Sequence, residues 1–139
     1  MAKTFKLNIL SPEREFFSGN AVSLVLPVSD GMLGIMAGHS PLTAAIDDGE
    51  VIFTAENGEK TVCVVTRGII DVASEQVTLL CEAALYPDEI DAELERRRIE
   101  EAKNELKKKQ SKRNFEIWQL SLNKAMNRLK VKSKKDRQH

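Results

Sequence analysis

Apolar and polar residues alternate in short runs through the first 85 positions of the chain. Phe5, Leu7 and Ile9 alternate with polar residues, which is the pattern of a strand with one buried face. The pattern recurs at five later places: Val22/Leu24/Leu26, Val51/Phe53, Val62/Val64, Ile70/Val72 and Val77/Leu79/Cys81. Many short strands at close spacing predict an antiparallel β-sandwich or a flattened barrel.

Turn-forming residues separate these runs. They are Asp48-Gly49, Asn57-Gly58 and Ser74-Glu75. An Asn-Gly pair is typical of a two-residue hairpin turn in which both residues have a positive φ. We therefore predict such a turn at Asn57-Gly58.

Beyond position 87 the apolar residues recur at helical spacing. The first stripe is Ile90, Leu94, Ile99, Ala102 and Leu106, and the second is Phe115, Trp118, Leu122, Ala125 and Leu129, with Met126 beside it. We expect Asp88 to cap the first helix, Asp91 to lie in its first turn, and residues 110–114 to form the turn between helices. Two helices of about 20 residues each would be only marginally stable in isolation.

The composition changes at the same position as the periodicity. All seven glycines and all four prolines lie at or before Pro87. Residues 1–87 carry 5 Lys or Arg and 11 Asp or Glu, a net charge of −6, whereas residues 88–139 carry 16 and 10, a net charge of +6. We predict an α+β chain with an N-terminal antiparallel β-sandwich domain, residues 1–85, and a C-terminal αα-hairpin domain, residues 88–139.

Residues 26–42 read LPVSDGMLGIMAGHSPL and contain three glycines and two prolines. This spacing predicts tight turns between short strands. Between the turns the segment is mostly apolar, so an exposed surface here would offer small and apolar groups to a partner. The segment has no nucleophile–base pair and no set of metal ligands, so we expect neither a catalytic site nor a metal site.

Four parts of this segment resemble the signature of the epsilon subunit of bacterial F-type ATP synthases: Leu26-Pro27, Asp30-Gly31, Leu33-Gly34-Ile35 and Gly38-His39-Ser40-Pro41-Leu42. The family pattern is approximately LP-x-x-(D/E)G-x-LGI-x-x-GH-x-PL. Further similar stretches are Ser11-Pro12-Glu13-Arg14 with Phe17-Ser18-Gly19, Gly68-Ile69-Ile70-Asp71-Val72 and Val77-Thr78-Leu79-Leu80. The resemblance covers residues 3–106 well, and beyond them it lies mainly in helical character and basic charge.

The resemblance implies a noncatalytic rotor subunit that links the gamma subunit to the c-ring and so couples ion flow to ATP synthesis. The implied contact residues are Asp30, Gly31, Met32, Leu33, Gly38, His39, Pro41 and Leu42. Met32 stands where many relatives carry an acid, which suggests an apolar contact at this position. The implied location is peripheral, on the cytoplasmic side of the bacterial cell membrane.

The resemblance also implies that the helices regulate ATP hydrolysis. In the family the hairpin folds on the sandwich in one state, and in another it extends along gamma into the alpha/beta catalytic head and obstructs hydrolysis. The expected contact residues are Phe115, Trp118, Leu122, Lys124, Arg128, Leu129 and Lys130. From Lys107 to His139 there are 12 Lys or Arg and two acids, and the family's target includes an acidic segment of the beta subunits, so the attraction has the right sign.

Some relatives bind ATP through a motif of the form (I/L)D-x-x-R-A at the start of the first helix. Here Ile90-Asp91 matches, but Leu94 and Glu95 hold the arginine and alanine places. A leucine offers no charged donors to phosphate, and Glu95 repels it. Asp91 and Arg98 are the candidate nucleotide residues that remain, and we expect the isolated chain to bind ATP weakly or not at all, with no other cofactor.

Several alternatives stay open. A sandwich adaptor whose basic helices bind nucleic acid would explain the +6 half of the chain but not residues 26–42. His39 is a turn residue that satisfies backbone groups, a contact residue, or both. Residues 96–98 form a solvated helix face or pair with nearby glutamates at i,i+3 and i,i+4. Residues 130–137 are a solvated terminus or a partner surface.

Other features exclude broad classes of protein. No apolar run is long enough for a transmembrane helix, and the N-terminal MAKTFKLNILS is too short and polar for a signal peptide. Both cysteines, Cys63 and Cys81, lie in strand-like runs. We expect two reduced, buried thiols rather than a disulfide.

Overall fold

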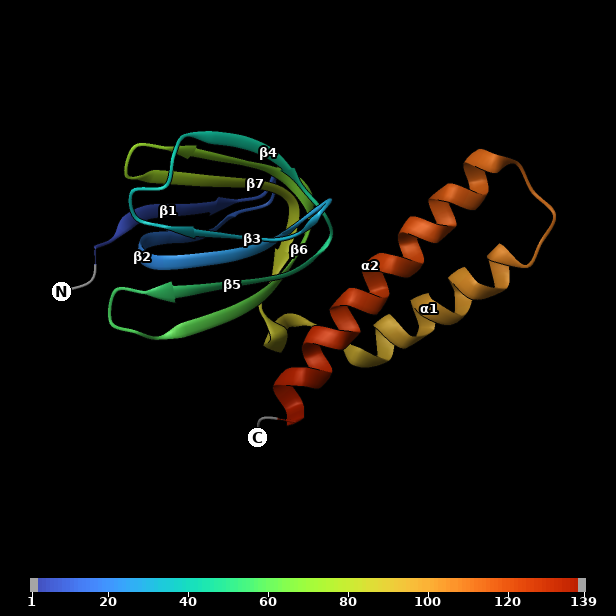
Figure 1. The fold of residues 1–139 in the computed structure, drawn as a ribbon. Coiled ribbons are helices and arrows are strands. Elements are labelled where there is room, and N and C mark those ends of the chain that lie inside the picture. Colours follow the sequence, from blue (N-terminus) through green and yellow to red (C-terminus); the bar gives the residue numbers. More distant parts are fainter. Residues whose placement is uncertain (1–2, 138–139) are drawn as a thin grey trace. The chain divides into compact units, whose positions relative to one another are not determined.

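A computed structural model describes residues 3–137, with side chains through residue 135, and confirms the α+β fold (Figure 1). The strands are β1 (Phe5–Leu10), β2 (Glu15–Val28), β3 (Gly31–Met36), β4 (Leu42–Ile46), β5 (Gly49–Ala55), β6 (Lys60–Ala73) and β7 (Gln76–Leu85). They are followed by a 3-10 turn, η1 (Pro87–Glu89), and by two helices, α1 (Ala92–Leu106) and α2 (Lys112–Arg137).

The long strands β2 and β6 organise the sandwich because each takes part in both of its layers. Residues 15–21 of β2 pair with β1, and its later residues pair with β5 on one side and β3 on the other. Residues 60–65 of β6 pair with β5, and its later residues pair with β7 and β4. All pairs are antiparallel except β1 with β7, which is parallel and closes the ladder into a flattened barrel.

The alternation predicted from the sequence accounts for most of the core. Its members in β1, β5 and β7 are buried, as are Leu24, Leu26, Ile70 and Val72. The predicted burial is wrong at two positions. Val22 is only half-buried because the register of β2 on β5 shifts between Ala21 and Ser23. Val62 is half-buried because Cys63 is the residue that pairs with the core-facing Val51.

The turn predicted at Asn57-Gly58 exists, but its conformation is different. Gly58 has a φ of 89°, whereas Asn57 has no positive φ. The Gly58 amide donates to the Ala55 carbonyl at 2.9 Å, and the Glu59 amide donates to Asn57 Oδ1 at 2.9 Å. The Asn57 side chain therefore stabilises a longer loop in which Gly58 alone adopts the left-handed conformation.

The helix boundaries also differ from the prediction. Asp91, not Asp88, caps α1, because its Oδ1 accepts the Leu94 amide at 3.1 Å. Asp88 lies in η1, which is separated from α1 by an extended residue, Ile90. The connection spans residues 107–111 rather than 110–114, because the Ser111 hydroxyl oxygen accepts the Asn114 amide at 3.2 Å and so caps α2.

The predicted stripes lie partly in the hairpin core. Ile90, Ala102 and Ala125 are buried, and most other members are half-buried. Phe115 and Met126 are 45% and 50% exposed, so neither belongs to the core. Further buried residues of this unit, not anticipated from the pattern, are Pro87, Glu95 and Val131.

The chain divides into two compact units between Leu85 and Tyr86. This division lies close to the position where the charge reverses and the glycines and prolines end. We predict that residues 1–85 fold independently of the hairpin.

We predict that Gly68→Ala strongly destabilises the protein. An added Cβ at Gly68 would lie 1.8 Å from the backbone oxygen of Leu80 on the paired strand. Because backbone must move to relieve this overlap, the free energy of unfolding should fall by about 3 kcal/mol. Gly34→Ala is the matched control, because its Cβ would meet nothing within 4 Å. Urea denaturation followed by circular dichroism measures both, and equal stability of the two variants would contradict the expectation.

Candidate functional site

The β2–β3 hairpin presents the first half of the 26–42 segment. Pro27 pairs with Met32 and Val28 with Gly31, so Ser29 and Asp30 form the turn. Gly31 has a φ of 130°, a conformation that favours glycine. Asp30 and Met32 are both exposed at this end of β3.

The outward row of β3 forms an apolar strip. Met32 and Met36 are 58% and 66% exposed, and Gly34 lies between them with open space above its Cα. Gly34 pairs with the half-buried Val25 of β2. Successive side chains of a strand point to opposite faces, so the buried Ile35 faces the core while Met32, Gly34 and Met36 face outward.

The GHSP turn lies at the other end of β3. Gly38 has a φ of 85°, the His39 amide donates to the Met36 carbonyl at 3.2 Å, and His39 Nδ1 lies 2.7 Å from the Ser40 carbonyl oxygen. That ring nitrogen therefore donates to the carbonyl. His39 thus fulfils the turn role, and the rest of its half-buried ring stays partly accessible to a partner.

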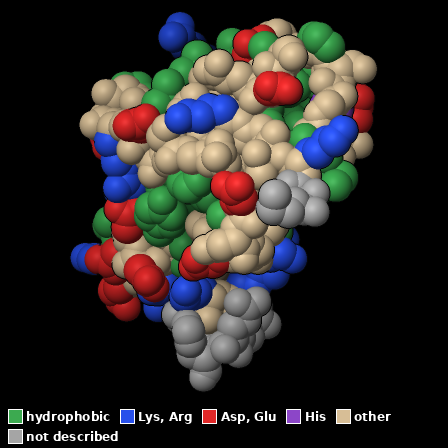
Figure 2. Space-filling view, turned by 90° about the vertical axis from the view of Figure 1, so that its left-hand side faces the viewer, with side chains coloured by type: hydrophobic (Ala, Val, Ile, Leu, Met, Phe, Trp, Pro, Cys, Tyr) green, Lys and Arg blue, Asp and Glu red, His purple; other side chains and the backbone are tan. Residues whose placement is uncertain are grey.

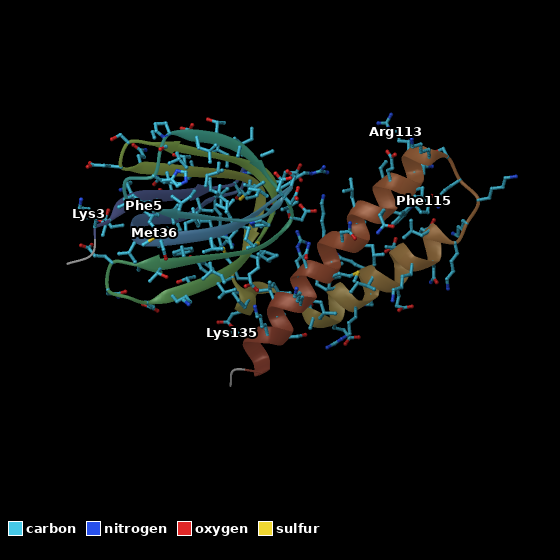
Figure 3. The ribbon with its side chains drawn as sticks, in the orientation of Figure 1. Lys3, Phe5, Met36, Arg113, Phe115 and Lys135 are labelled. Carbon is cyan, nitrogen blue, oxygen red and sulfur yellow. The ribbon has the colours of Figure 1, made fainter. Side chains whose placement is uncertain are left out.

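A hollow of about 850 Å³ lies beside this turn. Its lining includes Lys3, Gly38, His39, Pro41 and Glu75. Lys3 and Met36 lie at the same end of the sandwich in Figure 3. The two predicted contact segments, in contrast, are not brought together, because the six residues of β3 separate them by about 17 Å.

An apolar groove of about 800 Å³ was not anticipated from the sequence. Its lining is Leu10, Ser11, Pro12, Ala45, Ile46, Asp47, Arg67, Gly68, Ile69, Leu80, Cys81 and Glu82. Ile69 and Leu80 are cross-strand partners, about half exposed each, and Arg67 pairs with Glu82 at 3.5 Å. A signal was present in the sequence: Ile69 and Leu80 are apolar at positions where the alternation predicts polar, outward-facing residues.

Figure 2 shows one face of the molecule, on which hydrophobic groups are interspersed with both acidic and basic side chains. The β3 strip and the Ile69–Leu80 groove are the places in the sandwich where exposed apolar side chains gather. Apolar contact is therefore the interaction that these two surfaces offer best.

The predicted regulatory residues of α2 lie in different environments. Phe115 and Lys130 are exposed, and the other five are half-buried. Phe115 lies near the turn between the helices in Figure 3. A groove of about 630 Å³ between the helices is lined by Arg96, Ile99, Glu100, Lys103, Met126, Leu129, Lys130 and Ser133. Only part of the predicted stripe is thus open to a partner while the hairpin is folded.

Both candidate nucleotide residues have structural roles. Asp91 caps α1, and Arg98 Nη1 lies 2.7 Å from Glu95 Oε1. Of the glutamate pairs weighed for residues 96–98, Arg96 with Glu93 is present at 3.8 Å on the surface. The shorter pair, between Arg98 and Glu95, is not anticipated from the sequence, which predicts only that Glu95 repels phosphate.

Neither a metal centre nor a membrane span is found in the described part of the chain. Residues 3–137 contain no group of three or more His, Cys, Asp or Glu side chains that could hold a metal ion. None of the described helices is long and apolar enough to cross a membrane. Both cysteines are buried free thiols.

Comparison with known proteins places this geometry in context. Residues 4–87 match the family described as "ATP synthase, Delta/Epsilon chain, beta-sandwich domain". The chain is 32% identical over 134 residues to the ATP synthase epsilon chain of Caldanaerobacter subterraneus subsp. tengcongensis, covering 96% of this chain and 97% of the relative. It is 40% identical over 103 residues to the ATP synthase epsilon chain of Dichelobacter nodosus, covering 74% of this chain and 69% of the relative.

Solved structures share the fold at lower identity. A chain in the OSCP/F1/c-ring structure of Euglena gracilis mitochondrial ATP synthase superposes with a TM-score of 0.80 and 18% identity, covering 89% of this chain and 78% of that chain. A chain in the central stalk/c-ring structure of Tetrahymena thermophila mitochondrial ATP synthase superposes with a TM-score of 0.67 and 11% identity. The match covers 94% of this chain and 98% of that chain. At such identities the likeness shows a common fold.

Cys81 provides a probe of the Ile69–Leu80 groove. Burial raises the pKa of its thiol to about 11, and Sγ donates to the Leu10 carbonyl at 3.5 Å. Because the thiolate is the nucleophile, modification in a Cys63→Ala variant should rise about tenfold per pH unit from pH 8 to pH 10 and level off near pH 11. Stopped-flow labelling with a maleimide measures this rate. A plateau already at pH 9 would contradict the expected pKa.

Proposed function

The chain belongs to the family of ATP synthase epsilon chains, noncatalytic stalk subunits of that enzyme, and from this membership we propose that its sandwich links the gamma subunit to the c-ring. The observation that carries the proposal is the presence of two exposed apolar surfaces on one small β unit, the β3 strip and the Ile69–Leu80 groove. A linker needs two such surfaces because it must hold two partners at once.

We assign the ring contact to the β3 strip and the gamma contact to the groove. The strip runs from Asp30 through Met32, Gly34 and Met36 towards His39, so a partner that lies along β3 reaches both predicted segments. The exposed Met32 side chain supports an apolar contact at the Asp30 end of the strip. The groove is supported as the gamma contact by its size, by its apolar floor and by the Arg67–Glu82 pair at its side.

The helical hairpin is proposed to restrain ATP hydrolysis by the alpha/beta head. Its excess of basic residues supports attraction to an acidic target. The nucleic-acid alternative is not proposed, because it explains neither residues 26–42 nor the match of residues 4–87 to the epsilon-chain family. As part of the complex, the chain would lie peripherally on the cytoplasmic side of the bacterial membrane.

Leu80→Asp should weaken binding to the isolated gamma subunit at least tenfold. The new carboxylate would have to be desolvated in the groove without a partner, which costs more than the lost apolar contact alone. Met32→Asp on β3 is the control, because Met32 is similarly exposed, at 58% against 51% for Leu80, and lies in the strip assigned to the ring. Calorimetric titration with gamma measures the affinity, and thermal unfolding checks the fold. Equal affinity of the two variants would exclude the groove as the gamma contact.

Truncation after Leu85 should raise ATP hydrolysis by the reconstituted complex while leaving its assembly and coupling largely intact. The sandwich keeps both proposed contact surfaces, and we propose that residues 1–85 fold alone. The measurements are the steady-state hydrolysis rate, ATP synthesis in vesicles and the circular dichroism of the fragment. Unchanged hydrolysis in an assembled complex would leave the chain a purely structural subunit.

The isolated chain should show no saturable binding of Mg-ATP up to about 1 mM. Leu94 lacks a donor for phosphate, and the Arg98 guanidinium already pairs with the Glu95 carboxylate at 2.7 Å. Isothermal titration of the full chain provides the test. A dissociation constant in the low micromolar range would show that other residues compensate for the departure from the family motif.

A further inference from the structure

Glu95 is a buried carboxylate in the middle of a basic hairpin. Its residue exposure is 2%, and it is the charged residue that falls in the buried class within residues 3–135. Removing a carboxylate from water is costly unless cations and hydrogen-bond donors replace the solvent. The residues around Glu95 must therefore supply that replacement.

Two arginines from different helices do so. Arg98 Nη1, one turn further along α1, lies 2.7 Å from Oε1 and 3.2 Å from Oε2 of Glu95. Arg128 Nη1, on α2, lies 3.6 Å from the same Oε1, and its side chain is only 20% exposed. The Arg98 pair lies within one helix, so it cannot hold α1 to α2. The Arg128 pair crosses between the helices.

The apolar seam of the hairpin is thin by comparison. Its fully buried side chains are those of Ala102, Ala125 and Val131, two alanines and a valine, while Phe115 and Met126 remain about half exposed. Burial of a methyl group contributes only about 1 kcal/mol. Since isolated helices of this length are marginal in water, a seam of this size leaves closure of the hairpin dependent on its buried charges.

We propose that Glu95 and Arg128 form an internal lock that holds α1 and α2 together without a bound ligand. Glu95 contacts both arginines, and opening the hairpin would separate it from Arg128 while both groups regain water. The free energies of the closed and open states then differ by the net contribution of this contact and of the small apolar seam. Closure is thus a property of the isolated chain and can be tested independently of any effect on hydrolysis.

The test uses the distance between the helices in the full chain. Cys63 and Cys81 are replaced by alanine, and spin labels are attached at Glu101→Cys on α1 and Ser121→Cys on α2, both exposed positions. Pulsed electron paramagnetic resonance then measures the distance between the two labels. The labelled chain that keeps Glu95 should give a single, short distance between the labels. Glu95→Gln should raise the ratio of open to closed hairpin roughly tenfold or more, because the ion pair between Glu95 and Arg128 across the two helices is then lost.

Two further variants make the outcome decisive. Glu93→Gln removes the same charge from α1 at an exposed pair with Arg96, at 3.8 Å on the same helix, and should leave the distance unchanged. Exchange of the two charges, Glu95→Arg with Arg128→Glu, should restore closure in large part. An unchanged distance in Glu95→Gln, or an equal change in Glu93→Gln, would overturn the lock.

Discussion

Strands β2 and β6 each pair with three other strands, and this sharing is the constraint on which the sandwich depends. A strand that belongs to both layers fixes their register and spacing at once. The close approach at Gly68, where any Cβ would meet the backbone of β7, follows from the same arrangement. Within the described sandwich, β3 and β4 each pair with a single strand, so their outer edges leave backbone groups open to other molecules.

Function in this family member resides in surfaces and not in reactive groups. Burial raises the pKa values of both thiols, and the GHSP histidine forms a hydrogen bond within its own turn. What the sandwich exposes instead is apolar: two methionines on β3 and the Ile69–Leu80 pair. Exposed apolar groups in a small unit have a cost in solubility, which the proposed place between two partners would remove.

The hairpin follows a different balance. Its apolar contacts are modest, and an ion cluster around the buried Glu95 supplements them. Such a cluster contributes less stability than good apolar packing would, because desolvation offsets much of the attraction. It does confer a defined pairing of two helices that can separate without exposing a large apolar core. This is the behaviour expected of an element that exchanges its internal contacts for those of a partner.

The sequence by itself determined the fold class, the change from β to α structure near Pro87, most core rows and the family, because alternation, helical spacing and glycine-proline turns are local patterns. It did not determine the Ile69–Leu80 groove, the separation of the two contact segments along β3, or the partners of Glu95. Those depend on which strands and helices become neighbours. A residue such as Glu95 has the same local pattern whether it faces water or an arginine on another helix, and only the tertiary structure decides between them.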